Sequence, residues 1–197
     1  MTLNDFIQFD PSKDSPRQLP QLPGNYFVLI RDLNAMPNHD YEISCKVFNG
    51  MNVIYTGVSQ KNLYNRIWKN HFGNVSGNST LRQSLGCLFG YKQSARNENK
   101  QDDDHIRFSP ENEAMLTAWM KKNLIFFFLP YQDYSTLELA LIRLFNPPLN
   151  LEGNLGVANA QFRAYIQVLR SETPWQTKYK KVQALLKELN GQIAYDT

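Results

Sequence analysis

The alternation of apolar and polar positions predicts a small sheet with three main strands. Short runs rich in β-branched and aromatic residues cover residues 24–31, 52–56 and 124–129. Runs of this length, bounded by glycine, proline or asparagine, are typical of buried strands. Asn49-Gly50 precedes the second run and is a turn signal. Residues 32–50 are predicted to form a loop with room for one extra strand.

Apolar residues at three- and four-residue spacing predict helices in much of the remaining chain. The predicted helices cover residues 60–72, 79–89, 109–123 and 136–145, with two more helices at the C-terminal end. The last one carries an apolar stripe from Trp175 to Leu189. We expect this stripe to pack on its own domain, and the alternative is a docking face for another protein.

These elements predict an α/β (α+β) fold, with a small three-stranded mixed or antiparallel sheet flanked by helices. Residues 1–21 are polar and contain few periodic apolar positions, so we predict an N-terminal tail. The predicted main domain covers residues 22–151. Residues 152–197 are predicted to be C-terminal helices that pack on this domain or extend it.

Composition is consistent with a folded domain in the cytoplasm. Of the 197 residues, 42% are hydrophobic and 13% aromatic, which is enough for a core. The longest apolar run, 124–130, is far shorter than a membrane span, so we expect no membrane partner. The N-terminus shows no secretory signal pattern. Cys45 and Cys87 lack metal-ligand spacing and are predicted to be free thiols.

Basic residues concentrate in one part of the chain. Between residues 58 and 100 seven Lys or Arg residues stand against a single acid, Glu98. Such an excess suits a polyanionic partner, and the alternative is a solvated basic face. Lys61, Lys69 and Arg82 are the candidate nucleic-acid-binding residues.

One acidic residue stands in unusually apolar surroundings. The predicted helix 136–145 is apolar almost all round, apart from Glu138 and Arg143. Five residues correspond to about 140° around an α-helix, so these two charges do not pair. The Glu138 carboxylate therefore needs a metal ion, a cation such as Arg66 or a solvent-lined cleft, unless it reaches water at the edge of the face.

Two short motifs and three later residues resemble the GIY-YIG endonuclease family. Gly24-Asn25-Tyr26 is similar to the first motif of the family and Tyr55-Thr56-Gly57 to the second. Arg66 in the following helix, then Glu138 and Asn150, match family positions in the same order. The segment 79–86, followed later by Asn-Pro-Pro-Leu-Asn, is similar to a bacterial branch of the family.

The resemblance implies a GIY-YIG nuclease-like fold and hydrolysis of DNA phosphodiester bonds with one divalent metal ion, Mg²⁺ or Mn²⁺. It implies that Tyr26 deprotonates or orients the attacking water, that Tyr55 hydrogen-bonds the phosphate or Tyr26, and that Arg66 neutralises phosphate oxygens. Glu138 would hold the metal. The remaining site candidates are His71 as a catalytic residue, and Gly57 and Asn150 as positioning residues.

The chain departs from the family pattern at several positions. Asn25 replaces an Ile or Val, and Val58 follows the second motif where many members have Lys, a role that Lys61 is placed to take. His71 follows Arg66 by five residues where four is commoner. The alternative function is therefore a catalytically weak or inactive nucleic-acid-binding module. We expect Tyr26 and Tyr55 to share an exposed edge that faces Arg66 and Glu138.

Overall fold

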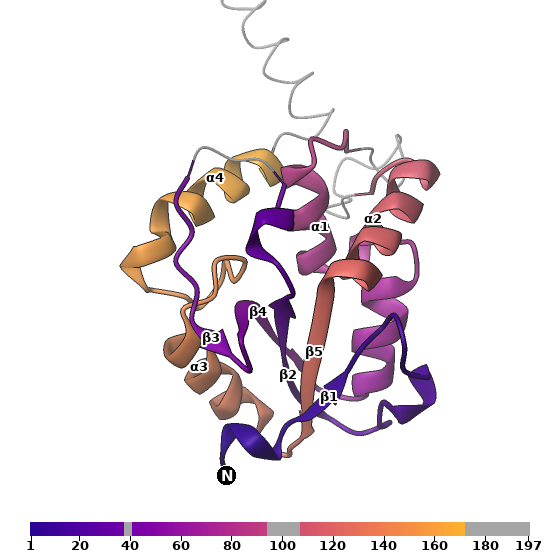
Figure 1. The fold of residues 1–197 in the computed structure, drawn as a ribbon, viewed down its shortest axis with the longest axis vertical. Coiled ribbons are helices and arrows are strands. Elements are labelled where there is room, and N and C mark those ends of the chain that lie inside the picture. Colours follow the sequence, from indigo (N-terminus) through magenta and orange to yellow (C-terminus); the bar gives the residue numbers. More distant parts are fainter. Residues whose placement is uncertain (38–40, 94–106, 172–197) are drawn as a thin grey trace, which may run out of the picture.

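A five-stranded antiparallel sheet forms the centre of the molecule (Figure 1). The computed structural model describes residues 1–37, 41–93 and 107–171. The sheet order is β1-β5-β2-β4-β3. The strands are β1 (Ile7–Phe9), β2 (Gly24–Ile30), β3 (Val47–Phe48), β4 (Met51–Ser59) and β5 (Leu124–Pro130).

The prediction of a three-stranded sheet was wrong, because two very short strands extend it at its edges. The strand β1 comes from the segment predicted as a tail and pairs with β5, Ile7 opposite Phe128. The strand β3 has two residues and joins β4 through Asn49-Gly50, where both residues have positive φ (47° and 74°). Such a turn matches the twist of a two-residue hairpin. Neither strand is long enough to show alternation in the sequence.

The helices cover both faces of the sheet. The α-helices are α1 (Thr80–Leu88), α2 (Pro110–Asn123), α3 (Tyr134–Phe145) and α4 (Ala160–Ser171), and η4 (Asn65–Asn70) is a π-helix. Short 3-10 helices are η1 (Leu3–Asp5), η2 (Pro16–Gln18), η3 (Leu33–Ala35), η5 (Ser76–Asn78) and η6 (Val157–Asn159). Within the described ranges no helix is both long and apolar enough to cross a bilayer. The stripe from Trp175 to Leu189 lies outside the described residues.

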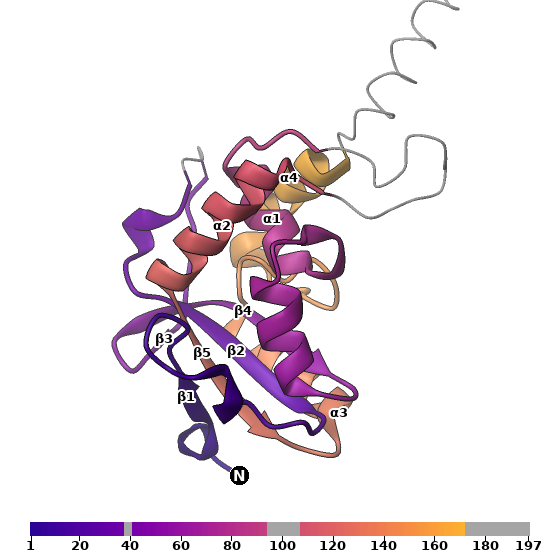
Figure 2. The same cartoon turned by 90° about the vertical axis from the view of Figure 1, so that its right-hand side faces the viewer.

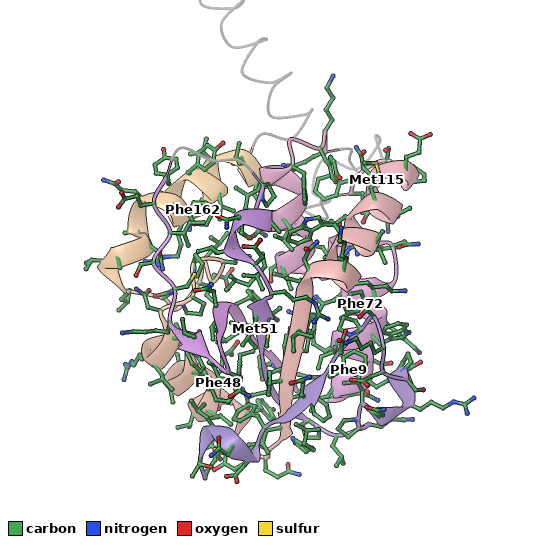
Figure 3. All side chains as sticks on the ribbon, viewed as in Figure 1. Phe9, Phe48, Met51, Phe72, Met115 and Phe162 are labelled. Carbon is green, nitrogen blue, oxygen red and sulfur yellow. The ribbon has the colours of Figure 1, made fainter. Side chains whose placement is uncertain are left out.

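Two hydrophobic clusters lie on opposite faces of the sheet. The larger cluster joins one face to η4, α1, α2 and α4, and the smaller cluster packs α3 against the other face. Figure 2 shows α1, α2 and α4 stacked above the strands, while α3 lies apart from them. Side chains fill the space between the elements, from Phe48 and Met51 near β3 to Phe9 and Phe72 on the opposite side (Figure 3). Because the sheet is covered twice, the strands are buried along most of their length.

A β-bulge in β4 sets which residues face the larger cluster. Val28 pairs with Tyr55 and Leu29 with Val53, so Ile54 is the extra residue. Tyr55 pairs with Val28, two residues along β2 from Tyr26, so it points to the same face as Tyr26, and both belong to the larger cluster.

Candidate active site

Gly57 leaves the space that Tyr26 occupies. Tyr26 pairs with Gly57 across β2 and β4. A Cβ atom at residue 57 would lie 2.3 Å from the Tyr26 hydroxyl oxygen, closer than two such atoms can approach. Without that side chain the Tyr26 ring lies over the strand beside Tyr55, with ring centroids 6.3 Å apart. The glycine of the second motif is therefore a packing requirement of the tyrosine in the first.

The Tyr26 hydroxyl is the meeting point of a buried hydrogen-bond network. Its oxygen lies 2.7 Å from His71 Nε2 and accepts a hydrogen bond from Arg66 Nε at 3.2 Å. Tyr26 is fully buried, and this burial raises the pKa of its phenol well above the ordinary value although Arg66 acts in the opposite direction. The phenol is therefore neutral in this state of the protein.

The π-helix η4 explains how Arg66 and His71 reach the same atom. In an α-helix, residues five apart point about 140° away from each other. A π-helix instead forms hydrogen bonds between residues five apart, so such residues lie on one side. The π-helix covers Asn65–Asn70, so it contains Arg66 and ends directly before His71. The five-residue spacing is thus accommodated by local geometry, and His71 joins Arg66 at Tyr26.

His71 is fully buried and held at both ring nitrogens. Its Nδ1 lies 2.7 Å from Ser79 Oγ, which also accepts a hydrogen bond from the Arg82 backbone N–H. Burial lowers the pKa of His71 well below its ordinary value, and the nearby charges of Arg66 and Arg82 lower it further. The imidazole is therefore neutral. Because the Ser79 oxygen has two lone pairs, it can accept from Nδ1–H as well, which leaves Nε2 as an acceptor for Tyr26.

A cavity of about 280 Å³ opens beside this network. Its polar lining comes from β4, η4, α1, α3, the segment after α3, and α4: Tyr55, Arg66, Thr80, Glu138, Asn150, Glu152 and Arg170. Tyr55 is hydrogen-bonded to Thr80 through their hydroxyl groups at 2.9 Å. Tyr26 and His71 do not line the cavity and contact it through Arg66. The structure thus brings Tyr55, Arg66 and Glu138 to one opening, with Tyr26 and His71 behind it.

Glu138 contributes a half-buried carboxylate to this cavity. Burial raises its pKa, the positive charge of Arg66 lowers it, and the neighbouring Glu152 raises it again. Among the described residues, no hydrogen bond or ion pair to the Glu138 side chain is found. Its oxygens are therefore available to a ligand.

A family model described as the GIY-YIG catalytic domain matches residues 24–172. The chain belongs to the GIY-YIG family. Members of this family are nucleases that act on nucleic acid and generally use a divalent metal ion. No curated protein and no solved structure matched the chain. The family match extends through α4, beyond residue 151 where we predicted the end of the main domain.

The donor atoms in the cavity fit the divalent metal ion of GIY-YIG nucleases. Glu138 and Glu152 are the carboxylates among the lining residues. In the part of the chain that the structure describes, no group of three or more His, Cys, Asp or Glu side chains has the arrangement of a metal site. Mg²⁺ needs no such cluster, because it commonly binds one or two carboxylates together with water and substrate phosphate. Glu138 and Glu152 are the carboxylates of the cavity that could supply such ligands.

Asn150 completes the free edge of β4. Its side-chain oxygen accepts from Thr56 N–H at 2.8 Å and its amide donates to Thr56 C=O at 2.9 Å. Next to it, Leu149 N–H donates to the carbonyl of Ile54, the bulge residue, at 3.0 Å. The strand β3 pairs only with Met51 and Asn52 of β4. Residues 149–150 supply hydrogen-bond partners for the following part of this β4 edge. These contacts are of the kind that a positioning role for Asn150 requires.

Asn25, the departure in the first motif, contacts the helix that carries Glu138. The amide of Asn25 donates to the carbonyl oxygen of Tyr134, the first residue of α3, at 2.8 Å. An Ile or Val at this position could not form that bond. Asn25 therefore links β2 to the first turn of α3, one turn before Glu138.

The structure places two groups of predicted residues differently from the sequence prediction. Tyr26 and Tyr55 do not lie on an exposed edge, because Tyr26 is fully buried and Tyr55 is only 6% exposed. Arg82, predicted to bind nucleic acid, is 0% exposed. Its guanidinium forms an ion pair with Glu113 and donates to His71 C=O at 2.8 Å. That prediction was wrong for Arg82, because a charge count along the chain does not distinguish a buried arginine from a surface one.

The two predicted lysines are on the surface. Lys61 and Lys69 are both exposed, and Lys69 Nζ lies 5.7 Å from the centroid of the Tyr64 ring. Lys69 lies in the π-helix that carries Arg66, and Lys61 precedes this helix by four residues. Their position is compatible with contact to a nucleic-acid backbone.

Sequence reasoning missed four residues around the cavity: Ser79, Thr80, Glu152 and Arg170. Ser79 caps α1, and a serine at a helix start is fully explained by capping, so nothing in the sequence indicated its contact with His71. Thr80 is the first residue of the same helix, and Glu152 belongs to a segment without a periodic pattern. Arg170 lies in a helix that we had assigned to the C-terminal part, and only the tertiary packing brings it here.

Proposed function

We propose that the chain is a divalent-metal-dependent endonuclease that hydrolyses DNA phosphodiester bonds. The observation that carries this proposal is the single cavity shared by Tyr55, Arg66 and Glu138, with the Tyr26–His71 pair directly behind Arg66. Cation, hydroxyl and carboxylate are the groups that phosphodiester hydrolysis needs close together.

Arg66 and Tyr55 bind the phosphate in this proposal. The guanidinium of Arg66 is fixed by the Tyr26 oxygen at Nε and by the Asn78 carbonyl, 2.9 Å from Nη1. A fixed guanidinium neutralises the negative charge that develops on the non-bridging oxygens. Tyr55 lies at the cavity wall with its hydroxyl on Thr80 and donates a hydrogen bond to the phosphate when that contact rearranges. Lys61 and Lys69 contact flanking phosphates.

The proton of the attacking water passes to the oxygen of Tyr26. The water oxygen forms the new bond to phosphorus, one ester P–O bond breaks, and the leaving oxygen takes a proton from solvent. Because burial keeps Tyr26 neutral, its phenol accepts that proton only while it gives its own to His71 Nε2, 2.7 Å away. His71 is neutral, so its Nε2 has a lone pair that can take this proton, although its lowered pKa disfavours keeping it.

Glu138, with Glu152 beside it, is the proposed ligand of the divalent ion. When bound, the ion stabilises negative charge on the phosphate and the leaving oxygen. The Glu138 side chain is half-buried and lines the cavity, so an ion bound in the cavity can reach its carboxylate.

One observation favours the second candidate, a catalytically weak or inactive nucleic-acid-binding module. Tyr26 has no exposed surface and does not line the cavity, so water does not reach its hydroxyl in this conformation. Catalysis through Tyr26 then requires a displacement of side chains around its hydroxyl, to admit the attacking water when substrate binds. A module that binds without cleaving would need no such displacement.

A plasmid nicking assay separates these two functions. The wild-type protein is incubated with supercoiled DNA and Mg²⁺ or Mn²⁺, with a chelator as the metal-free control. We expect nicking by the wild type and losses of roughly 100-fold or more for Glu138→Ala and Tyr26→Phe. Glu111→Ala and Tyr131→Phe remove the same groups from exposed positions outside the cavity and should retain full activity.

Binding is measured on the same samples. DNA binding without nicking by the wild type would support the binding module and overturn the nuclease. Nicking that survives Glu138→Ala would overturn the metal assignment, and nicking that survives Tyr26→Phe would remove Tyr26 from proton transfer. If RNA is cleaved in preference to DNA in a parallel assay, the proposed substrate changes from DNA to RNA.

A further inference from the structure

Arg170 brings a second arginine into the cavity from a part of the chain outside the GIY-YIG motifs. It lies in the last turn of α4 and lines the same cavity as Arg66, Glu138 and Thr80. Figure 1 shows α4 lying beside α1, the helix whose first residue is Thr80. The position of Arg170 therefore depends on how α4 packs on the rest of the domain.

One side of the Arg170 guanidinium is fixed and the other is unpaired. Its Nη2 donates to Gln83 Oε1 on α1 at 2.6 Å. Its Nε is buried and has no hydrogen-bond partner among the described residues, and no carboxylate forms an ion pair with Arg170 there. A half-buried cation that no carboxylate contacts in an ion pair is stabilised when an anion binds to it.

The surroundings of Arg170 match those of a phosphate contact. Its charge interacts with Tyr55 and Glu152, both of which line the cavity. Thr80 is the first residue of α1, and a helix N-terminus favours negative charge. A guanidinium has a planar set of donors that fits phosphate oxygens in pairs. Gln83 holds Nη2 of this set at the cavity wall, and Nε has no hydrogen-bond partner among the described residues.

We infer that Arg170 is a second substrate-binding arginine, which contacts the phosphate backbone of the nucleic acid in the cavity that Arg66 also lines. This inference rests on the proposed function. It makes α4 part of the substrate site, so that the catalytic unit needs residues beyond the last motif residue, Asn150. A purely structural Arg170 would only tie α4 to α1 through Gln83.

Two variants distinguish substrate binding from the structural tie. Arg170→Gln removes the charge, and Gln83→Leu removes the tie while keeping the charge. Affinity for a fluorescent DNA duplex is measured by anisotropy in Ca²⁺ at several salt concentrations, with thermal unfolding as the check on folding. We expect Arg170→Gln to weaken binding roughly tenfold and to lower the dependence of log K on log salt by about one. Arg170→Lys should recover part of the loss.

Arg143→Gln is the matched control, because Arg143 is an exposed arginine of α3 that does not line the cavity. It should leave both the affinity and the salt dependence unchanged. Wild-type affinity and salt dependence in a folded Arg170→Gln protein would overturn the inference while the nuclease proposal stands. If the wild type binds DNA without nicking it, the nuclease proposal fails. The DNA affinities of the wild type and Arg170→Gln then still show whether Arg170 contacts the DNA. If the wild type binds neither DNA nor RNA, both proposals fail.

Discussion

The absence of a side chain at Gly57 determines where the proposed catalytic residue Tyr26 lies. The tyrosine and the glycine are 31 positions apart in sequence and directly opposite in the sheet. Any Cβ atom at residue 57 would overlap the Tyr26 ring or hydroxyl, with contacts of 2.3–2.9 Å. On its other side, the Tyr26 hydroxyl oxygen lies 2.7 Å from His71 Nε2. The ring therefore cannot move away from residue 57 and keep this contact unchanged.

We predict that Gly57→Ala displaces Tyr26 from His71 and Arg66. Overpacking of this kind typically costs about 1–3 kcal/mol, and we expect a fall of that size in the free energy of unfolding together with loss of nicking. Urea denaturation and the plasmid assay measure the two effects. Gly90→Ala is the control, because it meets no atoms within 4 Å but has φ +72°. It should cost about 1–2 kcal/mol and leave nicking unchanged. Equal nicking by both variants would contradict the packing argument.

The residues of the proposed site could be named from the sequence, but not their contacts. Tyr26, Tyr55, Arg66 and Glu138 stand in motif order, and three of them line one cavity. The side of the helix on which His71 lies was not predictable, because the spacing only becomes productive in a π-helix. Ser79 and Arg170 carry no local pattern that reports a contact across the fold.

At the scale of elements, the periodic segments were predicted well and the short ones were not. The structure has α1, α2 and α3 close to the predicted ranges, since each has a capping residue whose side chain accepts a hydrogen bond from the first turn. The strands β1 and β3 have three and two residues, so their pairing is decided by neighbouring strands. Local sequence cannot report such pairing.

The buried pair of Arg82 and Glu113 joins α1, α2 and the segment between η4 and α1. Glu113 accepts hydrogen bonds from Ser76 N–H and Oγ–H, both at 2.9 Å, and from Phe108 N–H at 3.3 Å. Arg82 in turn donates to Thr117 Oγ1 at 2.7 Å. Because this network also includes the His71 carbonyl, it fixes the backbone behind the proposed site.

We predict that Glu113→Ala is strongly destabilising. It leaves the fully buried Arg82 without its counter-charge, and breaking one partner of such a pair typically costs about 3–5 kcal/mol. The free energy of unfolding from urea denaturation measures this loss. Glu111→Ala, an exposed acid in the same turn of α2, should change it by less than about 0.5 kcal/mol. A loss below about 1 kcal/mol for Glu113→Ala would show that the network is not a structural support.

For the whole molecule, the fold distributes its positive charges between interior and surface. Arg82 serves the core, Arg66 and Arg170 line the cavity, and Lys61 and Lys69 remain on the surface. The excess of basic residues between 58 and 100 is therefore only partly available to a polyanion. The sequence could predict the amount of charge in this region but not this division, because the division depends on where Glu113 and α4 pack.

The burial of His71 beside Arg66 and Arg82 also affects how the stability of the molecule depends on pH. His71 stays neutral in the folded protein, because burial and the charges of Arg66 and Arg82 hold its pKa well below 6.5. In the unfolded chain a histidine binds a proton near pH 6.5. Below about pH 6.5 the unfolded state therefore binds more protons than the folded state, and the free energy of unfolding falls by up to about 1.4 kcal/mol per pH unit. Above that pH the two states do not differ at this residue.

We predict that this slope disappears when His71 is replaced by glutamine. Urea denaturation of the wild type and of His71→Gln between about pH 5.5 and pH 8 gives the free energy of unfolding of each protein. The difference between them isolates His71, because all other titrating groups are shared. It should be constant at neutral pH and should shrink as the pH falls below about 6.5, since only the wild type loses stability through this residue. A constant difference over the whole range would mean that His71 binds a proton in the folded state, and a protonated Nε2 could not accept the proton of Tyr26.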